Sequence, residues 1–223
     1  LELPTAAQDI GAGSIGNYAV FAGGMISGIP DHFISTVTTY NGSLVRGTAS
    51  SLTQPEKEGR GHTMGARVGN YLLFAGGYGI QDGGGYGDMY YTFNLVDAYN
   101  TSLVKTTATA LTARVRHGGK YGHGNTWYAI FSVGGDATLN LYNASLVRTT
   151  LVTTANKAPV GMATFENFTI MVAANTNTVE VLDNLTLLKF PGDPLPANTR
   201  ADSCVTLGTA ILVAGNNIVY ALT

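Results

Sequence analysis

The chain has 223 residues, enough for one large or two ordinary domains, and 45% of them are hydrophobic, so a real core can form. Charged residues make up only 12%, the formal net charge is −2, and no basic patch stands out, so we expect no nucleic-acid partner. No charged amino-terminal region and no apolar run of about 18 residues occur, so we expect no signal peptide and no membrane insertion. Because the sequence begins at Leu1 rather than Met, we expect a trimmed, processed or partial chain.

The most informative pattern along the chain is an apolar stretch that recurs and ends in two small residues. IGNYAVFAGG ends at Gly24, and VGNYLLFAGG ends at Gly77. Weaker copies end at Gly135, Ala174 and Gly215. Self-similarity of this kind indicates a repeat architecture, and here it predicts five units of about 40 to 58 residues each.

Each unit contains four stretches that favour β-strands. A glycine-rich stretch comes first, as RHGGKYGHGN does in the third unit. The apolar run follows, and in the second unit Tyr71–Phe74 suits a strand buried on both faces. A partly alternating stretch with Val96, Ala98 and Tyr99 comes next, and the tail LVKTTATAL is rich in β-branched residues. No sustained helical period is present, so the sequence predicts an all-β fold.

A unit of four strands has the size of a propeller blade. One blade cannot bury its two apolar faces alone, but blades stacked around an axis bury them against each other. The glycine-rich first strand fits the crowded axis, and the Gly-Gly doublet fits a tight exit with positive φ. We therefore predict a single β-propeller domain over residues 1–223.

The sequence YN-x-S-L between the third and fourth stretches indicates a hairpin turn. Five Asn-x-Ser/Thr sequences occur in the chain, and in a secreted eukaryotic protein they would predict glycans. They begin at Asn41, Asn100, Asn143, Asn167 and Asn184. The first three fall at the same turn in successive units, which favours turn chemistry over glycosylation.

The order of these features resembles the kelch repeat: an apolar strand with Gly-Gly, a Tyr-containing strand, a turn and an Arg/His-Gly stretch. The resemblance covers nearly the whole chain and is clearest in the first three units. Their matching positions are Gly23–Gly24 with Tyr40, Gly76–Gly77 with Tyr99, and Gly134–Gly135 with Tyr142. The chain departs from the family pattern because no Trp follows the Tyr, and the last two units replace the doublet with Ala173–Ala174 and Ala214–Gly215.

The repeated YNxSLV is similar to arrays in bacterial and phage-associated proteins. The resemblance therefore implies a divergent kelch-like β-propeller, and it favours an extracellular or virion-associated setting such as a phage tail or a cell surface. We expect five four-stranded blades in a ring that is closed by pairing of the two ends of the chain, and six or more blades are the alternative if the chain is a fragment. LELPTA at the start aligns with the end of a fourth strand at Thr109–Arg114, so Leu1–Leu3 are predicted to pair with Ile218–Leu222.

One side of the predicted propeller carries the long loops, at 25–36 and 78–95. Long loops on a rigid scaffold are common binding sites, and tyrosines among glycines and aspartates have the amphipathic composition of recognition surfaces. The candidate binding residues in these loops are Asp31, His32, Tyr78, Asp82, Tyr86, Asp88, Tyr90 and Tyr91. The alternative is a self-packed loop that covers a blade edge.

Arg60, Arg116 and Arg200 occupy similar places at the start of the first strand in three units. They could ring the entrance to a central channel, where guanidinium groups would suit a carboxylate or an acidic sugar. The family commonly has an arginine near this position, so a structural role is the other interpretation. We include these three arginines among the candidate binding residues.

The sequence shows only weak signals for a catalytic or metal-binding site. The histidines show no HExxH or Cys-paired metal spacing, so we expect no metal and no cofactor. The single cysteine, Cys204, lies in an apolar stretch where burial is the ordinary expectation.

We therefore expect a non-enzymatic binding propeller that recognises a protein or a glycan through its long loops. One alternative is a sugar enzyme of the mutarotase or oxidase kind acting at the channel mouth. The other is a structural module of a larger assembly.

Overall fold

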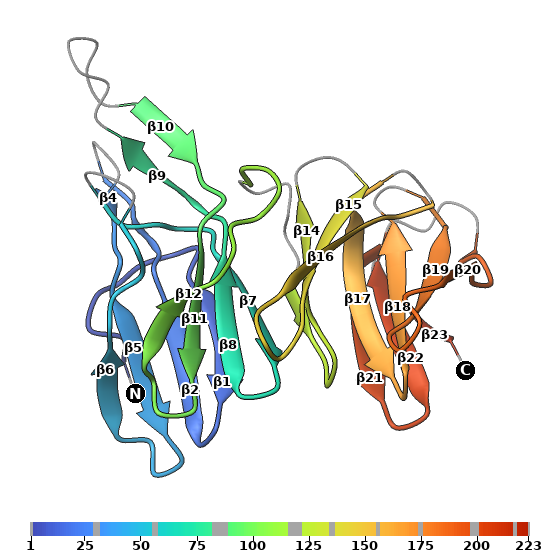
Figure 1. The fold of residues 1–223 in the computed structure, drawn as a ribbon, viewed down its shortest axis with the longest axis horizontal. Helices are drawn as coiled ribbons and strands as arrows, with labels where there is room; N and C mark the ends of the chain where they lie inside the picture. Colours follow the sequence, from blue (N-terminus) through green and yellow to red (C-terminus); the bar gives the residue numbers. More distant parts are fainter. Residues whose placement is uncertain are drawn as a thin grey trace.

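Every regular element in the computed structural model is a β-strand, over the residues that the structure describes: 2–28, 32–54, 58–81, 89–115, 122–133, 137–154, 157–173, 176–196, 201–215 and 218–222. Within these ranges no helix is long and apolar enough to cross a membrane. The strands form five successive antiparallel sheets, which we number blade 1 to blade 5, and two small hairpin sheets (Figure 1). The predicted all-β fold is confirmed.

Within each blade the strands follow one another in chain order. Blade 1 contains β1 (Gly11–Ile15), β2 (Tyr18–Ala22), β5 (Val37–Asn41) and β6 (Arg46–Ala49). Blade 2 contains β7 (Met64–Val68), β8 (Tyr71–Ala75), β11 (Val96–Asn100) and β12 (Lys105–Thr107). Blade 3 contains β13 (Gly122–Gly124), β14 (Ala129–Val133), β15 (Thr138–Tyr142) and β16 (Arg148–Val152).

The last two blades differ in size. Blade 4 contains β17 (Pro159–Phe165), β18 (Phe168–Ala173), β19 (Val179–Asp183) and β20 (Lys189–Pro191). Blade 5 contains three strands, β21 (Ala201–Leu207), β22 (Ala210–Gly215) and β23 (Ile218–Leu222). The two small sheets are the hairpin of β3 (Met25–Ile26) with β4 (His32–Phe33) and that of β9 (Tyr78–Gln81) with β10 (Met89–Thr92).

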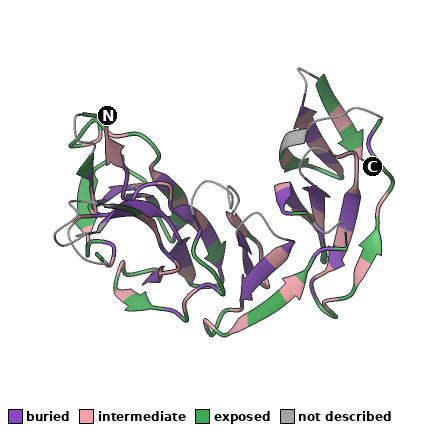
Figure 2. Cartoon of the chain, turned by 90° about the horizontal axis from the view of Figure 1, so that it is seen from above, coloured by how far each residue is buried: buried purple, intermediate pink, exposed green. Residues whose placement is uncertain are grey.

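The blades bury their apolar faces against each other, as the repeat pattern predicts. Val20 of blade 1 and Leu72 of blade 2 share one buried cluster, and Leu73 of blade 2 and Phe131 of blade 3 share the next. The second strands β8 and β14 are buried along almost their whole length because they have a neighbouring blade on each face (Figure 2). First strands of successive blades also lie against each other, β1 with β7 and β7 with β13.

The YNxSL turn is held by its asparagine side chain. Asn41 Oδ1 accepts hydrogen bonds from the backbone N–H groups of Ser43 at 3.0 Å and Val45 at 2.9 Å, and Asn100 and Asn143 make the same pair of bonds in blades 2 and 3. The turn chemistry predicted for these asparagines is therefore confirmed.

The Gly-Gly doublets of blades 1 and 2 adopt the positive φ that the sequence predicts, and Gly134–Gly135 lies outside the described residues. Gly23 and Gly24 have φ of 70° and 128°, and Gly76 and Gly77 have 68° and 116°. A Cβ added at Gly23 would lie 2.1 Å from the carbonyl oxygen of Arg60. Only glycine fits this exit, because both the backbone conformation and the close approach exclude a side chain.

The predicted ring closure is not what the structure shows. Blades 1 and 5 lie at the two ends of an open arc, and β23 is the last strand of a three-stranded sheet (Figures 1 and 2). Glu2 and Leu3 form no strand, and the Glu2 carbonyl accepts a hydrogen bond from the Tyr40 hydroxyl of blade 1. The pairing of Leu1–Leu3 with Ile218–Leu222 is corrected for this reason: the described part of that segment is already bound to blade 1.

Candidate functional site

Two hairpins extend from blades 1 and 2 on the side where the sequence predicts long loops. They are the β3–β4 and β9–β10 hairpins, and together we call them the arm (Figure 1). β4 lies against β9, so the arm is one continuous surface built from both insertions. The insertions are therefore partly β-structure and not only loops.

The arm is centred on three aromatic rings. Tyr78 and Tyr90 stack with ring centroids 5.4 Å apart and planes 9° from parallel. Phe33 meets Tyr78 edge to face at 5.4 Å and Tyr90 at 6.4 Å. Aromatic pairs at these separations are mutually stabilising, so the rings hold the hairpins together.

The strand register places these rings on one face. Tyr90 pairs with Ile80 and Tyr78 pairs with Thr92, so the two tyrosines are diagonal neighbours across the β9–β10 ladder. Tyr91 pairs with Gly79 and therefore belongs to the other face of the hairpin. Phe33, Tyr78 and Ile80 are buried, whereas the side chain of Tyr90 remains 48% exposed.

Charged and polar groups border the rings. His32 Nδ1 lies 3.0 Å from Glu58 Oε1, and Glu58 Oε2 accepts a hydrogen bond of 2.9 Å from the backbone N–H of Phe33. His62 Nε2 lies 3.2 Å from Asp9 Oδ2, and the His62 ring is 6.1 Å from Tyr78. The arm therefore has an apolar centre with a polar rim, as recognition surfaces have.

Arg60 is fully buried beneath the arm. Its Nη2 donates to Asp97 Oδ2, and its Nη1 donates to the carbonyl oxygens of Gly76 at 2.7 Å and Leu95 at 3.2 Å. Burial lowers the pKa of Arg60, while the Asp97 carboxylate opposes this shift. Arg60 thus ties the glycine exit of blade 2 to its third strand and has no exposed surface for a ligand.

The structure brings together part of the predicted site. Tyr78, Tyr90, Tyr91 and His32 all lie in the arm. Six other candidates lie outside the described residues: Asp31, Asp82, Tyr86, Asp88, Arg116 and Arg200.

Phe33 and Glu58 also belong to this surface, and neither is among the residues predicted from the sequence. Phe33 stands in the insertion DHFIST, where one apolar ring among polar residues signals a buried anchor. No local pattern identifies Glu58, because it reaches His32 across 26 positions of the chain.

Two clefts lie away from the arm. One, of about 490 Å³, separates blades 4 and 5 and is lined mainly by apolar groups, including Phe165, Ile170 and Leu222. The other, of about 400 Å³, is lined by Arg67, Gly69, Gly124, Asn125 and Thr126. Over the described ranges, no three His, Cys, Asp or Glu side chains lie close enough together to hold a metal ion.

The pKa values of His123 and Cys204 are shifted by burial, and both side chains face a neighbouring blade. Burial lowers the pKa of His123 to about 4, and its Nε2 lies 2.7 Å from Thr164 Oγ1 of blade 4. The half-buried Cys204 packs in the cluster shared by blades 4 and 5, and burial raises its pKa to about 11. A neutral imidazole and a protonated thiol are the expected states at neutral pH, so both groups serve packing.

Comparisons with known proteins agree on the fold. No protein-family model matches the sequence, and neither does any curated protein. Among solved structures, "Structure of YjhT" has a TM-score of 0.62 at 12% identity, and the match covers 96% of this chain and 74% of that one. "Crystal structure of Nidogen/Laminin Complex" has a TM-score of 0.60 at 10% identity and covers 97% and 76%. Both neighbours contain β-propellers, and with the antiparallel four-stranded sheets they support a propeller-like fold.

Proposed function

We propose that the protein is a non-enzymatic binding module of a divergent kelch-like type that recognises a protein or a glycan through the arm. The observation that carries the proposal is the ring of Tyr90, which is 48% exposed yet held by its stack on Tyr78. An exposed aromatic ring that is already ordered loses little conformational entropy when it binds, and tyrosines of this kind are frequent binding hot spots.

The polar rim supports the same proposal. The His32–Glu58 pair supplies hydrogen-bonding groups beside the rings, and a stacked ring next to such groups suits either a sugar face or an apolar side chain of a protein. The alternative is a sugar enzyme of the mutarotase or oxidase kind that acts at the channel mouth. Arg60, a candidate binding residue at the predicted mouth, is fully buried and offers no surface to a ligand there. An extracellular or virion-surface setting fits a binding module and is part of the proposal.

The test is binding to immobilised glycans and to a panel of surface proteins. We expect Tyr90→Ala to weaken binding of any ligand found by about thirtyfold or more, which corresponds to about 2 kcal/mol. The matched control is Phe190→Ala on β20, because Phe190 is similarly exposed but lies far along the chain in blade 4. Equal weakening in both variants, or binding unchanged in Tyr90→Ala, would place the binding surface elsewhere.

A further inference from the structure

The ring of Tyr90 has one face that its aromatic neighbours leave uncovered. The ring of Tyr78 lies parallel to it at 5.4 Å and covers the other face. The ring of Phe33 is 5.4 Å from Tyr78 and 6.4 Å from Tyr90, so Phe33 lies beside the stack. On the outer face of Tyr90, Phe33 would be much farther from Tyr78. The 48% exposure of Tyr90 agrees with an outer face that is open to a ligand.

A carboxylate lies directly beside this group of rings. Glu58 Oε2 accepts a hydrogen bond of 2.9 Å from the backbone N–H of Phe33, and Glu58 Oε1 lies 3.0 Å from His32 Nδ1. An ionised carboxylate has about four acceptor positions, so two contacts leave both oxygens able to accept a further hydrogen bond. The Glu58 side chain is 22% exposed and can therefore be reached from solvent.

Asp9 supplies a second carboxylate at the border of the arm. Its Oδ2 lies 3.2 Å from His62 Nε2, and the His62 ring is 6.1 Å from the Tyr78 ring. A β-bridge between Gln8 and Met25 holds this segment against β3. The Asp9 side chain is 36% exposed, so it also contributes negative charge to the solvent side of the arm.

The sequence of the arm and of the segment next to Glu58 is strongly acidic. The insertions 25–36 and 78–95 contain three aspartates and no lysine or arginine, and 55–59 contains two glutamates and one lysine. Five acidic and one basic residue give a formal charge of −4, whereas the whole chain carries −2, so the rest of the chain carries +2. Arg60 is fully buried and paired with Asp97, so it does not offset this charge at the surface. A local excess of negative charge favours a cationic partner.

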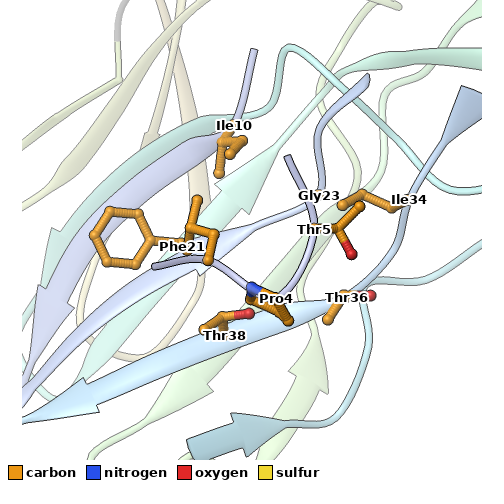
Figure 3. A pocket seen from close by; sticks show the side chains of 9 residues that line it. Pro4, Thr5, Ile10, Phe21, Gly23, Ile34, Thr36 and Thr38 are labelled. Atoms are coloured by element: carbon orange, nitrogen blue, oxygen red, sulfur yellow. The ribbon is translucent and has the colours of Figure 1, made fainter. Parts of the chain in front are cut away.

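Two other cavities do not suit a cation. The recess in Figure 3, between residues 3–5 and strands β2 and β5, measures about 20 Å³, and no charged side chain lines it. It has room for about one water molecule. The cleft of about 400 Å³ is lined by Arg67, which would repel a cation. The cleft between blades 4 and 5 contains one carboxylate, Asp193, which supplies a control below.

We propose that the partner of the arm is a basic segment of another protein, in which an arginine side chain stacks on Tyr90 and donates hydrogen bonds to Glu58. This proposal rests on the proposed binding function of the arm and names the class of its ligand. Arginine fits better than lysine because its planar guanidinium can stack on an aromatic face and also bind a carboxylate. A neutral glycan could stack on Tyr90 but would make no use of the negative charge.

The test uses a fluorophore-labelled peptide of three Gly-Ser-Arg repeats and two matched peptides, in which citrulline or lysine replaces arginine. Fluorescence anisotropy measures the binding of each peptide to the wild-type protein. We expect the arginine peptide to bind, and the citrulline peptide to bind about tenfold more weakly because citrulline has a similar shape without the charge. The lysine peptide should be intermediate, and added salt should weaken binding of the arginine peptide.

Three kinds of variant locate the interaction. Glu58→Gln keeps an acceptor for the Phe33 N–H and removes the charge, so it should weaken binding of the arginine peptide about fivefold and leave the citrulline peptide unchanged. Tyr90→Phe keeps the ring and should bind as the wild type does, whereas Tyr90→Ala should weaken binding by about thirtyfold or more. Asp193→Asn removes an exposed carboxylate far from the arm in the sequence and is the matched control, with no change expected.

The possible failures are distinguishable. Equal affinity for the arginine and citrulline peptides would overturn the inference, and so would a wild type that binds none of the peptides or an unchanged affinity in Glu58→Gln. If Tyr90→Ala then weakens binding of a neutral glycan or of another protein, the arm is a binding site and only the class of partner is wrong. If the arginine peptide binds Tyr90→Ala as tightly as the wild type, the arm is not its site, and the proposed function fails as well.

Discussion

The buried ion pair of Arg60 and Asp97 gives the sharpest prediction for stability. Asp97 is almost fully buried and accepts hydrogen bonds from Arg60 and from the backbone N–H and hydroxyl of Thr53 in the preceding blade. Asp97→Ala would leave the guanidinium buried without a counter-charge and would release the segment at Thr53. Loss of one partner of a buried pair costs about 3–5 kcal/mol, so we expect the free energy of unfolding to fall by about 4 kcal/mol.

Blade 3 suggests the control. Asn140 stands where Asp97 stands in blade 2 and accepts a 2.7 Å hydrogen bond from the backbone of Thr112. Asp97→Asn should therefore keep the contact with Thr53 and lose only the charge, with a smaller loss of about 2–3 kcal/mol. The double variant Arg60→Met with Asp97→Leu removes both charges and should be more stable than Asp97→Ala.

The assay is urea unfolding followed by circular dichroism for the wild type, the two Asp97 variants and the double variant. The reasoning fails if Asp97→Ala lowers the free energy of unfolding by less than about 1 kcal/mol. It also fails if the double variant is no more stable than Asp97→Ala, because removal of both charges leaves no unpaired charge in the core.

Two further predictions concern other blades. Burial lowers the pKa of His123 from 6.5 to about 4, so the folded state binds this proton less well than the unfolded state. The stability that the neutral imidazole contributes is therefore fully present above pH 6.5 and is lost as the pH falls toward 4. The loss in the free energy of unfolding is up to about 3 kcal/mol. Urea midpoints from pH 7.5 to 4 should fall less steeply in His123→Gln, and equal slopes would contradict this. Gly23→Ala places a Cβ 2.1 Å from the Arg60 carbonyl at φ of 70° and should destabilise by more than about 2 kcal/mol. The control is Gly47→Ala, whose Cβ would lie 3.0 Å from Thr39 Oγ1 at an ordinary φ, and it should change stability by less than about 1 kcal/mol. Both variants are measured by thermal unfolding, and a similar loss of stability in both would refute the steric explanation.

Part of the site could be predicted from the sequence. The long insertions identify Tyr78 and Tyr90 as candidates because tyrosines among glycines can be recognised from the sequence alone. Their stack on each other and on Phe33 could not be predicted, since it depends on the register of β9 with β10 and on the contact of β4 with β9. The sequence placed Arg60 wrongly at a channel mouth. Its burial could not be predicted, because it depends on the ion pair with Asp97, which lies 37 positions away in the chain.

What the sequence determined by itself is local: the strands, the asparagine turns and the glycine exits. Each of these depends on the conformational preference of a few neighbouring residues, such as the positive φ of Gly23 or the side-chain bonds of Asn41. Only the tertiary structure decided that the described sheets lie in an open arc (Figure 2) and that the Glu2 carbonyl binds Tyr40 without joining a strand. These features depend on contacts between residues that are far apart in the chain. Because the repeated units have similar local sequences, no local pattern indicates which units will contact each other.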